Sequence, residues 1–268
     1  MGARERHNVR IEGHGTTPIV FAHGFGCDQT MWRHVAPAFR RDHRVVLFDH
    51  IGAGDSDASA YDRTRYATLA GYAADVLEIL RELDLRDVVF VGHSVSATIG
   101  LLAAIRQPER FSRLVLVAPS PRYIHDDGYV GGFSQRDIEG LLDLLDSNYT
   151  AWSSAVAPTI MGNPDRPELG AELTRSFCRT DPTIARHFAR VTFLSDNRAD
   201  LPRVRTPSLI LQCAQDVIAP DEVGEYMHRA LPHSELVRMK ATGHCPNLSA
   251  PDETIAAIRA YLSPQAHA

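Results

Sequence analysis

Short runs of apolar residues, each bounded by turn-forming residues, recur along the chain and give the first indication of its architecture. The longest runs cover residues 18–24, 44–49, 88–92, 113–118 and 207–213. Nearly continuous apolar runs of this length are typical of strands that are buried on both faces of a parallel sheet. A shorter run at 235–239 predicts a further strand, and the alternation of polar and apolar residues over 8–13 predicts a strand at the sheet edge.

Longer segments with helical periodicity separate these runs. Residues 68–83 place apolar side chains at spacings of three and four, which is the pattern of a helix packed by one face against a core. Helices are also predicted over residues 95–106 and 252–262. Because strands that alternate with helices are joined by right-handed crossovers, the sequence predicts an α/β fold with a mostly parallel, doubly wound sheet.

The region from residue 122 to residue 195 interrupts this alternation. It contains no convincing buried strand, but segments that we expect to form four helices: 134–149, 150–162, 166–179 and 182–194. Such a region is too long for a plain connection, so we expect a helical cap (lid), inserted after the sixth strand into a core formed by 1–121 and 196–268. A surface decoration without a role is the alternative. The aromatic residues of the region favour a pocket wall: Tyr123, Tyr129, Phe133, Trp152, Phe177 and Phe193.

Composition narrows the class of protein without pointing to a function. The net charge of -5 offers no electrostatic attraction to nucleic acid or to an anionic membrane. The four cysteines form no C-x-x-C pair, so we expect reduced thiols, no metal site and no disulfide framework. The N-terminal segment lacks the apolar part of a signal peptide, and no apolar run reaches the roughly 20 residues of a membrane span. We therefore expect a cytoplasmic protein without a cofactor.

The stretch FVGHSVSATIG contains the strongest candidate for a catalytic residue. Gly92 ends a buried strand and a helix begins at residue 95, so Ser94 occupies the turn at the carboxyl edge of the sheet, where α/β folds bind ligands. Bulky side chains two positions before or after such a serine would clash. Gly92 meets this requirement, and Ser96, which stands where the G-x-S-x-G pattern has a second glycine, is small enough to meet it. We predict that Ser94 is a nucleophile rather than a helix cap.

A serine hydroxyl needs a base to act as a nucleophile, and in this fold the chain order is serine, acid, histidine. Asp216 follows the end of the strand at 207–213, and His244 lies in the loop after the strand at 235–239. Both loops leave the sheet at the same edge as Ser94. We therefore predict a catalytic triad of Ser94, Asp216 and His244. A turn or cap residue is the alternative for Asp216, and an ordinary loop histidine is the alternative for His244.

The oxyanion of an acyl-transfer intermediate needs two hydrogen-bond donors. We expect these to be the backbone N–H of Val95, which follows the nucleophile, and that of Phe25, in the glycine-flanked loop FAHGFGCDQ. His23, His93 and Asp49 lie near these segments in the sequence, and we assign them structural rather than catalytic roles.

Several segments resemble the RsbQ family of bacterial stress regulators and its plant relatives, the strigolactone and karrikin receptors. The similarity extends from about residue 8 to residue 262 and is carried by FAHGFGCDQTMW, GAGDSD, GHSVSATIGLLAAIRQPERFSRLVLVAPSPRY, FCRTDPTIARHFA, SLILQCAQDVIAP and GHCPNLSAPDETI. The resemblance implies an α/β-hydrolase core with a four-helix lid over an apolar pocket, and the same triad. It also implies the residues that line the pocket: Phe25, Tyr123, Phe133, Trp152, Val156, Val191 and Val217.

The same resemblance implies a hydrolase that has been recruited to signalling. RsbQ-like proteins act with a PAS-domain phosphatase of the PP2C type to switch on a stress sigma factor, and the plant receptors hydrolyse their ligand slowly and recruit partners through lid movement. We expect a monomeric serine hydrolase that cleaves a small, mostly apolar ester or lactone and signals to such a partner. A metabolic esterase, lactonase or carbon–carbon bond hydrolase is one alternative, and a sensor without turnover is another. Because the nucleophile is not a carboxylate, the sequence excludes haloalkane dehalogenase and epoxide hydrolase chemistry.

Overall fold

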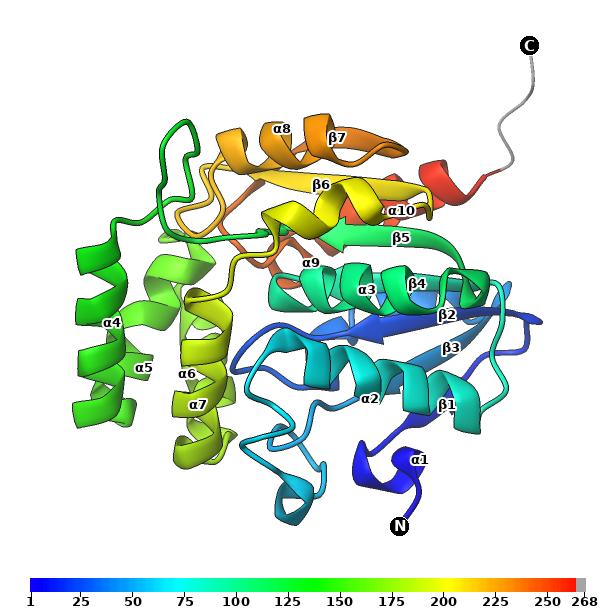
Figure 1. Cartoon of the computed structure of the whole chain (residues 1–268), viewed down its shortest axis with the longest axis horizontal. Helices are drawn as coiled ribbons and strands as arrows, with labels where there is room; N and C mark the ends of the chain where they lie inside the picture. Colours follow the sequence, from blue (N-terminus) through cyan, green and yellow to red (C-terminus); the bar gives the residue numbers. More distant parts are fainter. Residues whose placement is uncertain (264–268) are drawn as a thin grey trace.

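A seven-stranded sheet forms the centre of the molecule (Figure 1). The structure is a computed structural model that describes residues 1–263; residues 264–268, which the predicted core range includes, lie outside the described residues. The strands are β1 (Arg10–Glu12), β2 (Thr17–Ala22), β3 (His43–Phe48), β4 (Val88–His93), β5 (Phe111–Val117), β6 (Ser208–Ala214) and β7 (Ser234–Thr242). Their order is β1-β3-β2-β4-β5-β6-β7, and every pair of neighbours is parallel except β1 and β3. The predicted mostly parallel α/β sheet is therefore confirmed.

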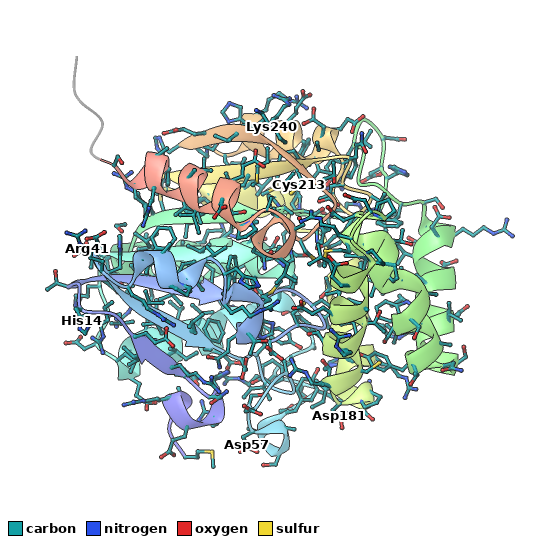
Figure 2. The ribbon with its side chains drawn as sticks, turned by 180° about the vertical axis from the view of Figure 1, so that it is seen from behind. His14, Arg41, Asp57, Asp181, Cys213 and Lys240 are labelled. Carbon is teal, nitrogen blue, oxygen red and sulfur yellow. The ribbon has the colours of Figure 1, made fainter. Side chains whose placement is uncertain are left out.

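Helices cover both faces of this sheet, which explains why the central strands are so uniformly apolar. The long helices of the core are α2 (Leu69–Glu82), α3 (Val95–Arg106), α8 (Asp221–Ala230) and α10 (Pro251–Leu262). Helices α2 and α3 lie in front of the sheet in Figure 1, whereas α10 covers the face that Figure 2 brings forward. As a result, every residue of β4 is buried. The short helices are α1 (Ala3–Arg6), α9 (Pro246–Ser249) and the 3₁₀ turns Gln29–Trp32, Ala36–Phe39, Ala58–Ala60, Pro108–Arg110 and Arg198–Arg203.

Four further helices lie together at one end of the sheet (Figures 1 and 2). They are α4 (Gln135–Ser147), α5 (Tyr149–Met161), α6 (Pro167–Arg179) and α7 (Pro182–Phe193), and we call them the cap helices. They connect β5 to β6, so five strands precede them in the chain. The predicted insertion after the sixth strand is therefore wrong by one strand. The division of the chain into a core and a cap at residues 122–195 stays a prediction.

Local sequence signals mark the ends of the cap helices. Ser134 caps α4 in a capping box with Asp137, in which each side chain bonds the backbone N–H of the other residue. Gly162 ends α5 in the left-handed conformation, with φ of 62°, which favours glycine. Asp181 caps α7 by accepting two backbone N–H groups, and Figure 2 shows it at one end of these helices. These signals explain why the helices could be located from the sequence.

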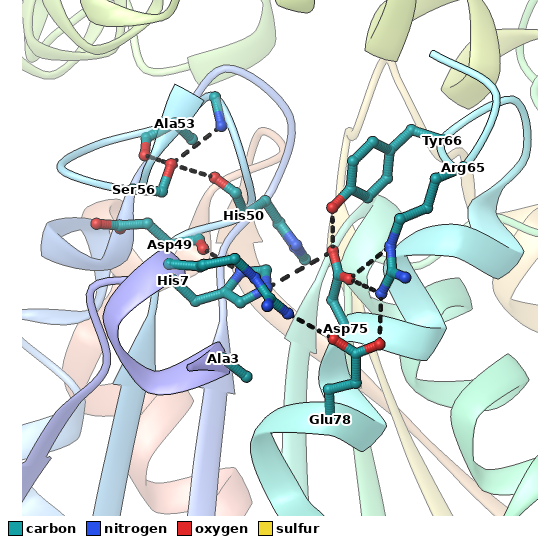
Figure 3. Close-up of polar contacts among 12 residues, drawn as sticks. Ala3, His7, Asp49, His50, Ala53, Ser56, Arg65, Tyr66, Asp75 and Glu78 are labelled. Atoms are coloured by element: carbon teal, nitrogen blue, oxygen red, sulfur yellow. Dashed lines mark hydrogen bonds and ion pairs between the residues drawn. The ribbon is translucent and has the colours of Figure 1, made fainter. Parts of the chain in front are cut away.

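A cluster of polar side chains ties the N-terminal segment to α2 (Figure 3). The buried carboxylate of Asp75 accepts a hydrogen bond of 2.8 Å from the Tyr66 hydroxyl and one of 3.1 Å from Arg65 Nε. On its other side lies His7, whose Nε2 is 3.7 Å from Asp75 Oδ2. Burial lowers the pKa of His7, against the opposing effect of this carboxylate. Acidification therefore works against the folded arrangement of this cluster.

The cysteines differ in exposure. Cys27, Cys213 and Cys245 are buried, and burial raises the pKa of each thiol, to about 12 for Cys27. Cys213 lies among the side chains of the strand layer in Figure 2. Cys178, on α6, is exposed. Within residues 1–263, no helix is both long enough and apolar enough to cross a membrane.

Candidate active site

Ser94 occupies a strained turn between β4 and α3. Its φ of 57° and ψ of -124° are a combination that residues other than glycine rarely adopt. Gly92 makes the turn possible, because a Cβ at this position would lie 2.4 Å from the carbonyl oxygen of Ser96. The N–H of Ser94 donates to the carbonyl of Val117 in β5 at 2.8 Å, which fixes the turn on the neighbouring strand. The serine is thus held at the carboxyl end of β4, as the sequence predicts.

The structure brings the side chains of Ser94, His244 and Asp216 together from three separate loops. His244 Nε2 lies 2.8 Å from Ser94 Oγ, and His244 Nδ1 lies 2.8 Å from Asp216 Oδ2. All three residues are buried, with exposed fractions of 7%, 4% and 4% in that order. The other oxygen of Asp216 accepts the N–H of Ile218 at 2.9 Å, which orients the carboxylate. With Nδ1–H donated to the carboxylate, Nε2 is free to accept a proton from the serine.

The backbone N–H groups of Val95 and Phe25 lie outside the regular hydrogen bonds of helices and strands. Val95 is the first residue of α3, so its N–H lies outside the hydrogen-bond ladder of the helix. Among the described residues, no backbone hydrogen bond of a turn, loop or cap has the N–H of Val95 or Phe25 as its donor. Phe25 also contributes its side chain to the cavity beside Ser94. The role of these groups as oxyanion donors stays a prediction.

Ser96, His50 and His23 form a buried hydrogen-bond chain behind this turn that sequence reasoning missed. Ser96 Oγ donates to the carbonyl of His23 at 2.5 Å and lies 2.7 Å from His50 Nε2. The N–H of His50 donates to His23 Nε2 at 3.0 Å, and His23 Nδ1 lies 2.9 Å from the carbonyl of Gly24. His50 therefore carries its proton on Nε2 and His23 on Nδ1. The chain connects the serine turn to the loop of Phe25.

His50 could have been noticed from its position. It follows β3 within two residues, so it lies at the carboxyl edge of the sheet with Ser94. Burial lowers its pKa well below the ordinary value of histidine, so it is neutral and can serve as a fixed donor.

His93 and Asp49 make contacts that fit the structural roles predicted for them. His93 Nε2 lies 2.7 Å from the carbonyl oxygen of His244, and burial lowers the pKa of His93 to about 3, so the neutral ring donates this bond. Asp49 accepts the backbone N–H of Gln29 at 2.8 Å and the side-chain amide of Asn8 at 2.8 Å. Both residues position backbone around the site.

A small cavity lies against Ser94 and His244. Its volume is about 30 Å³, which holds about two water molecules, whereas ligand pockets commonly measure ~300–1,000 Å³. The cavity is lined by Phe25, Cys27, His93, Ser94, Tyr123, Ile160, Leu173, Phe177, Thr192, Phe193, Ile218, His244 and Cys245. Phe25 explains the small size, since its ring packs against Phe177, Phe188 and Phe193 with centroids 5.7 to 6.1 Å apart.

Of the predicted pocket residues, Phe25 and Tyr123 line this cavity. Tyr123 is buried, its hydroxyl interacts with Ser94, and burial raises its pKa. Phe133 and Val156 are half-buried against the hydrophobic core and do not line this cavity. Trp152 is fully buried behind the wall, because its ring stacks on Phe177 with centroids 5.4 Å apart.

The two remaining predicted pocket residues point away from the cavity for local reasons. Val191 lines an outer groove beside α2, because successive residues on a helix lie about 100° apart and Thr192 takes the inward position. Val217 is 49% exposed, because the turn at Asp216 directs Ile218 inward in its place. These seven residues were implied by resemblance, and helix rotation and turn geometry decide which of them reach the cavity.

The loop that carries His244 is fixed to the end of α5. The N–H of His244 donates to the carbonyl of Ile160 at 2.9 Å. Asn163 Nδ2 bridges the carbonyls of Met161 and Thr242, at 2.6 and 3.1 Å. The cap helices and the histidine loop are therefore in direct contact.

No group of three or more His, Cys, Asp or Glu side chains within residues 1–263 is arranged to hold a metal ion. The polar groups around Ser94 are those of acyl transfer.

Comparison with known proteins places this geometry in a family. The model of the Alpha/beta hydrolase family matches residues 19–257. A probable esterase of Oryza sativa subsp. japonica is 44% identical over 260 residues, covering 96% of either protein, and the karrikin insensitive 2 receptor CA of Petunia hybrida is 42% identical over 259 residues, also covering 96% of either. The structure of a hydrolase from Oleispira antarctica superposes with a TM-score of 0.94 at 41% identity, covering 97% of this chain and 95% of that one. The chain belongs to the alpha/beta hydrolase family.

Proposed function

We propose that this protein is a serine hydrolase that cleaves a small, mostly apolar ester or lactone with Ser94, His244 and Asp216. The observation that carries the proposal is the pair of 2.8 Å contacts that links these side chains beside a small, largely apolar cavity. The esterase name of the rice relative supports an ester as the substrate.

The geometry supports a two-step acyl transfer. Ser94 Oγ attacks the carbonyl carbon while His244 Nε2 takes its proton, and Asp216 holds the imidazole and stabilises its charged form. The N–H groups of Val95 and Phe25 receive the developing oxyanion. Collapse of the tetrahedral intermediate breaks the ester bond, and His244 returns the proton to the leaving alcohol. Water, deprotonated by His244, then attacks the acyl-enzyme and releases the acid and the serine.

We further propose that residues 122–195 act as a lid over this site. The side chains of Ile160, Leu173 and Phe177 reach the cavity from α5 and α6. With a cavity of about 30 Å³, only a short acyl group fits without movement of these helices.

A signalling role is the second candidate. The contact between the His244 loop and α5 favours it, because acylation of Ser94 and a shift of the cap helices would then affect each other. The receptor name of the petunia relative adds support. An RsbQ-like function with a PAS-domain PP2C phosphatase as partner stays a prediction, as do the monomeric state and the cytoplasmic location.

The test of the hydrolase proposal is Ser94→Ala with p-nitrophenyl acetate. We expect turnover to fall by about 10⁶-fold, the loss typical of removing a triad serine, with little change in melting temperature. Ser112→Ala is the control, because Ser112 lies at the start of β5, whereas Ser94 contacts Val117 at the end of that strand. This variant should retain full activity. If Ser94→Ala keeps more than a few per cent of activity, another residue is the nucleophile.

Rapid mixing separates the two candidate functions. Steady release of p-nitrophenol near the ~10 s⁻¹ that is typical of enzymes favours a metabolic hydrolase. A single burst, with a persistent acetyl adduct on Ser94 in the intact mass, favours a sensor whose acylated state is the signal.

A further inference from the structure

Thr192 carries a buried hydroxyl that no other described group of the protein uses. The residue lies in the last turn of α7 and is 1% exposed. Within the described residues, its Oγ1 has no hydrogen-bond partner. A buried hydroxyl without a partner makes the folded state less stable than an apolar group of the same shape would. A ligand that bonds this hydroxyl would explain its position.

Several hydroxyls on helices of this protein donate to the carbonyl one turn earlier, and others bond a separate segment, as Ser96 does. Ser153 donates to the carbonyl of Tyr149 at 2.8 Å, and Thr174 donates to that of Gly170 at 3.0 Å. Thr192 makes no such bond, although it also lies on a helix. Its hydroxyl is therefore free to bond a group outside its own helix.

Thr192 is one of the residues that line the cavity beside Ser94. His93 Nδ1 is the other buried side-chain polar atom of the described wall without a partner. It is covered by backbone, because a Cβ on Gly24 would lie only 2.6 Å from it. Thr192 Oγ1 is thus the remaining unpaired side-chain polar atom among the described lining residues.

We propose that Thr192 is a specificity-determining residue that selects esters or lactones with a second oxygen function. A threonine hydroxyl both donates and accepts, so it fits a hydroxyl, ether or carbonyl oxygen of a short oxygenated substrate. An all-carbon chain of the same size would leave it unpaired, and a site built around a buried polar group discriminates against such a chain. This inference rests on the proposed hydrolase function.

Two pairs of p-nitrophenyl esters of matched shape test the proposal. The methoxyacetate differs from the butyrate by one ether oxygen in place of a methylene, and the 3-hydroxybutyrate differs from the 3-methylbutyrate by one hydroxyl in place of a methyl. The variants are Thr192→Val, which keeps the shape and removes the hydroxyl, and Thr192→Ser, which keeps the hydroxyl. Each variant is compared with the wild type on the same ester, so differences in intrinsic reactivity cancel.

In Thr192→Val, we expect the kcat/KM ratio of oxygenated to all-carbon ester to fall about tenfold in at least one pair. In Thr192→Ser the ratio should stay within about twofold of wild type. The melting temperature of Thr192→Val should rise, because an unpaired hydroxyl is removed. If both ratios are unchanged in Thr192→Val, Thr192 only shapes the wall and the inference is wrong. Activity retained by Ser94→Ala would instead overturn the hydrolase proposal itself.

Discussion

Ser96 stands two positions after the candidate nucleophile, and its hydroxyl has two buried partners. It donates to the carbonyl of His23 at 2.5 Å and lies 2.7 Å from His50 Nε2. Without it, both partners would be buried and unpaired, at a cost of about 1–3 kcal/mol for each. A glycine, which the usual pattern has here, could not make this link between the serine turn and the loop of Phe25.

We expect Ser96→Ala to lower the free energy of unfolding by about 2 kcal/mol or more. It should also lower kcat more than it raises KM, because the loop that carries the Phe25 N–H is no longer fixed. Thermal unfolding and steady-state kinetics with p-nitrophenyl acetate measure the two effects. Ser153→Ala is the matched control, since it removes a buried hydroxyl that bonds only within its own helix. Equal losses of kcat in both variants would contradict the role of Ser96.

At the scale of elements, the helices and central strands were predictable because their signals are local. The capping residue Ser134 and the apolar runs of the central strands depend only on neighbouring sequence. The edge strand β7 is longer than the predicted 235–239, because exposed polar residues such as Lys240, seen at the periphery in Figure 2, interrupt its apolar pattern.

The cavity wall was less predictable, because it depends on how the helices are rotated against one another. The serine, acid and histidine could be located from chain order and strand ends. Whether Val191 or Thr192 faces inward is decided by a rotation of about 100° on α7. The hydrogen bond between His50 and Ser96 joins residues that are 46 positions apart, so no local sequence pattern predicts it.

Trp152 is a packing residue of the cap helices, and its substitution should act on stability. Its ring stacks on Phe177 and lies within 6.0 Å of the Tyr149 and Phe25 rings. We expect Trp152→Ala to cost about 3–5 kcal/mol and to accelerate amide exchange in α5 and α6 more than in the sheet. Leu144→Ala, at a 44% exposed position on α4, should change little. Similar melting temperatures for the two variants would show that this cluster does not support the cap helices.

For the molecule as a whole, buried histidines determine the response to acid. Burial lowers the pKa of His7, His50 and His93, the last to about 3. In the unfolded chain these groups titrate near their ordinary value of 6.5, so below that pH the unfolded state binds more protons than the folded state. Stability is therefore full above about pH 6.5 and falls as the pH decreases toward the folded-state values.

Below its unfolded-state pKa, each of these histidines lowers the free energy of unfolding by up to about 1.4 kcal/mol for each pH unit of acidification. We expect the free energy of unfolding, measured by urea denaturation, to drop steeply between about pH 6.5 and pH 5. The amide of His50→Gln can still donate to Ser96 but does not titrate. This variant should therefore take up about one proton fewer on unfolding, which makes the dependence of the free energy of unfolding on pH less steep. A pH profile of His50→Gln that runs parallel to the wild-type profile would contradict this origin of the acid sensitivity.

The distribution of buried and exposed cysteines would allow the protein to be labelled at one position without mutation. Thiol reagents attack the thiolate, so the buried, high-pKa Cys27, Cys213 and Cys245 are protected in the folded protein, whereas Cys178 is exposed. A fluorophore or spin label added to the native sequence would attach at this single position. It would sit on α6, next to Phe177, which lines the cavity. Movement of the lid that we propose would then change the signal of this label, and it can be followed in real time without replacing a residue.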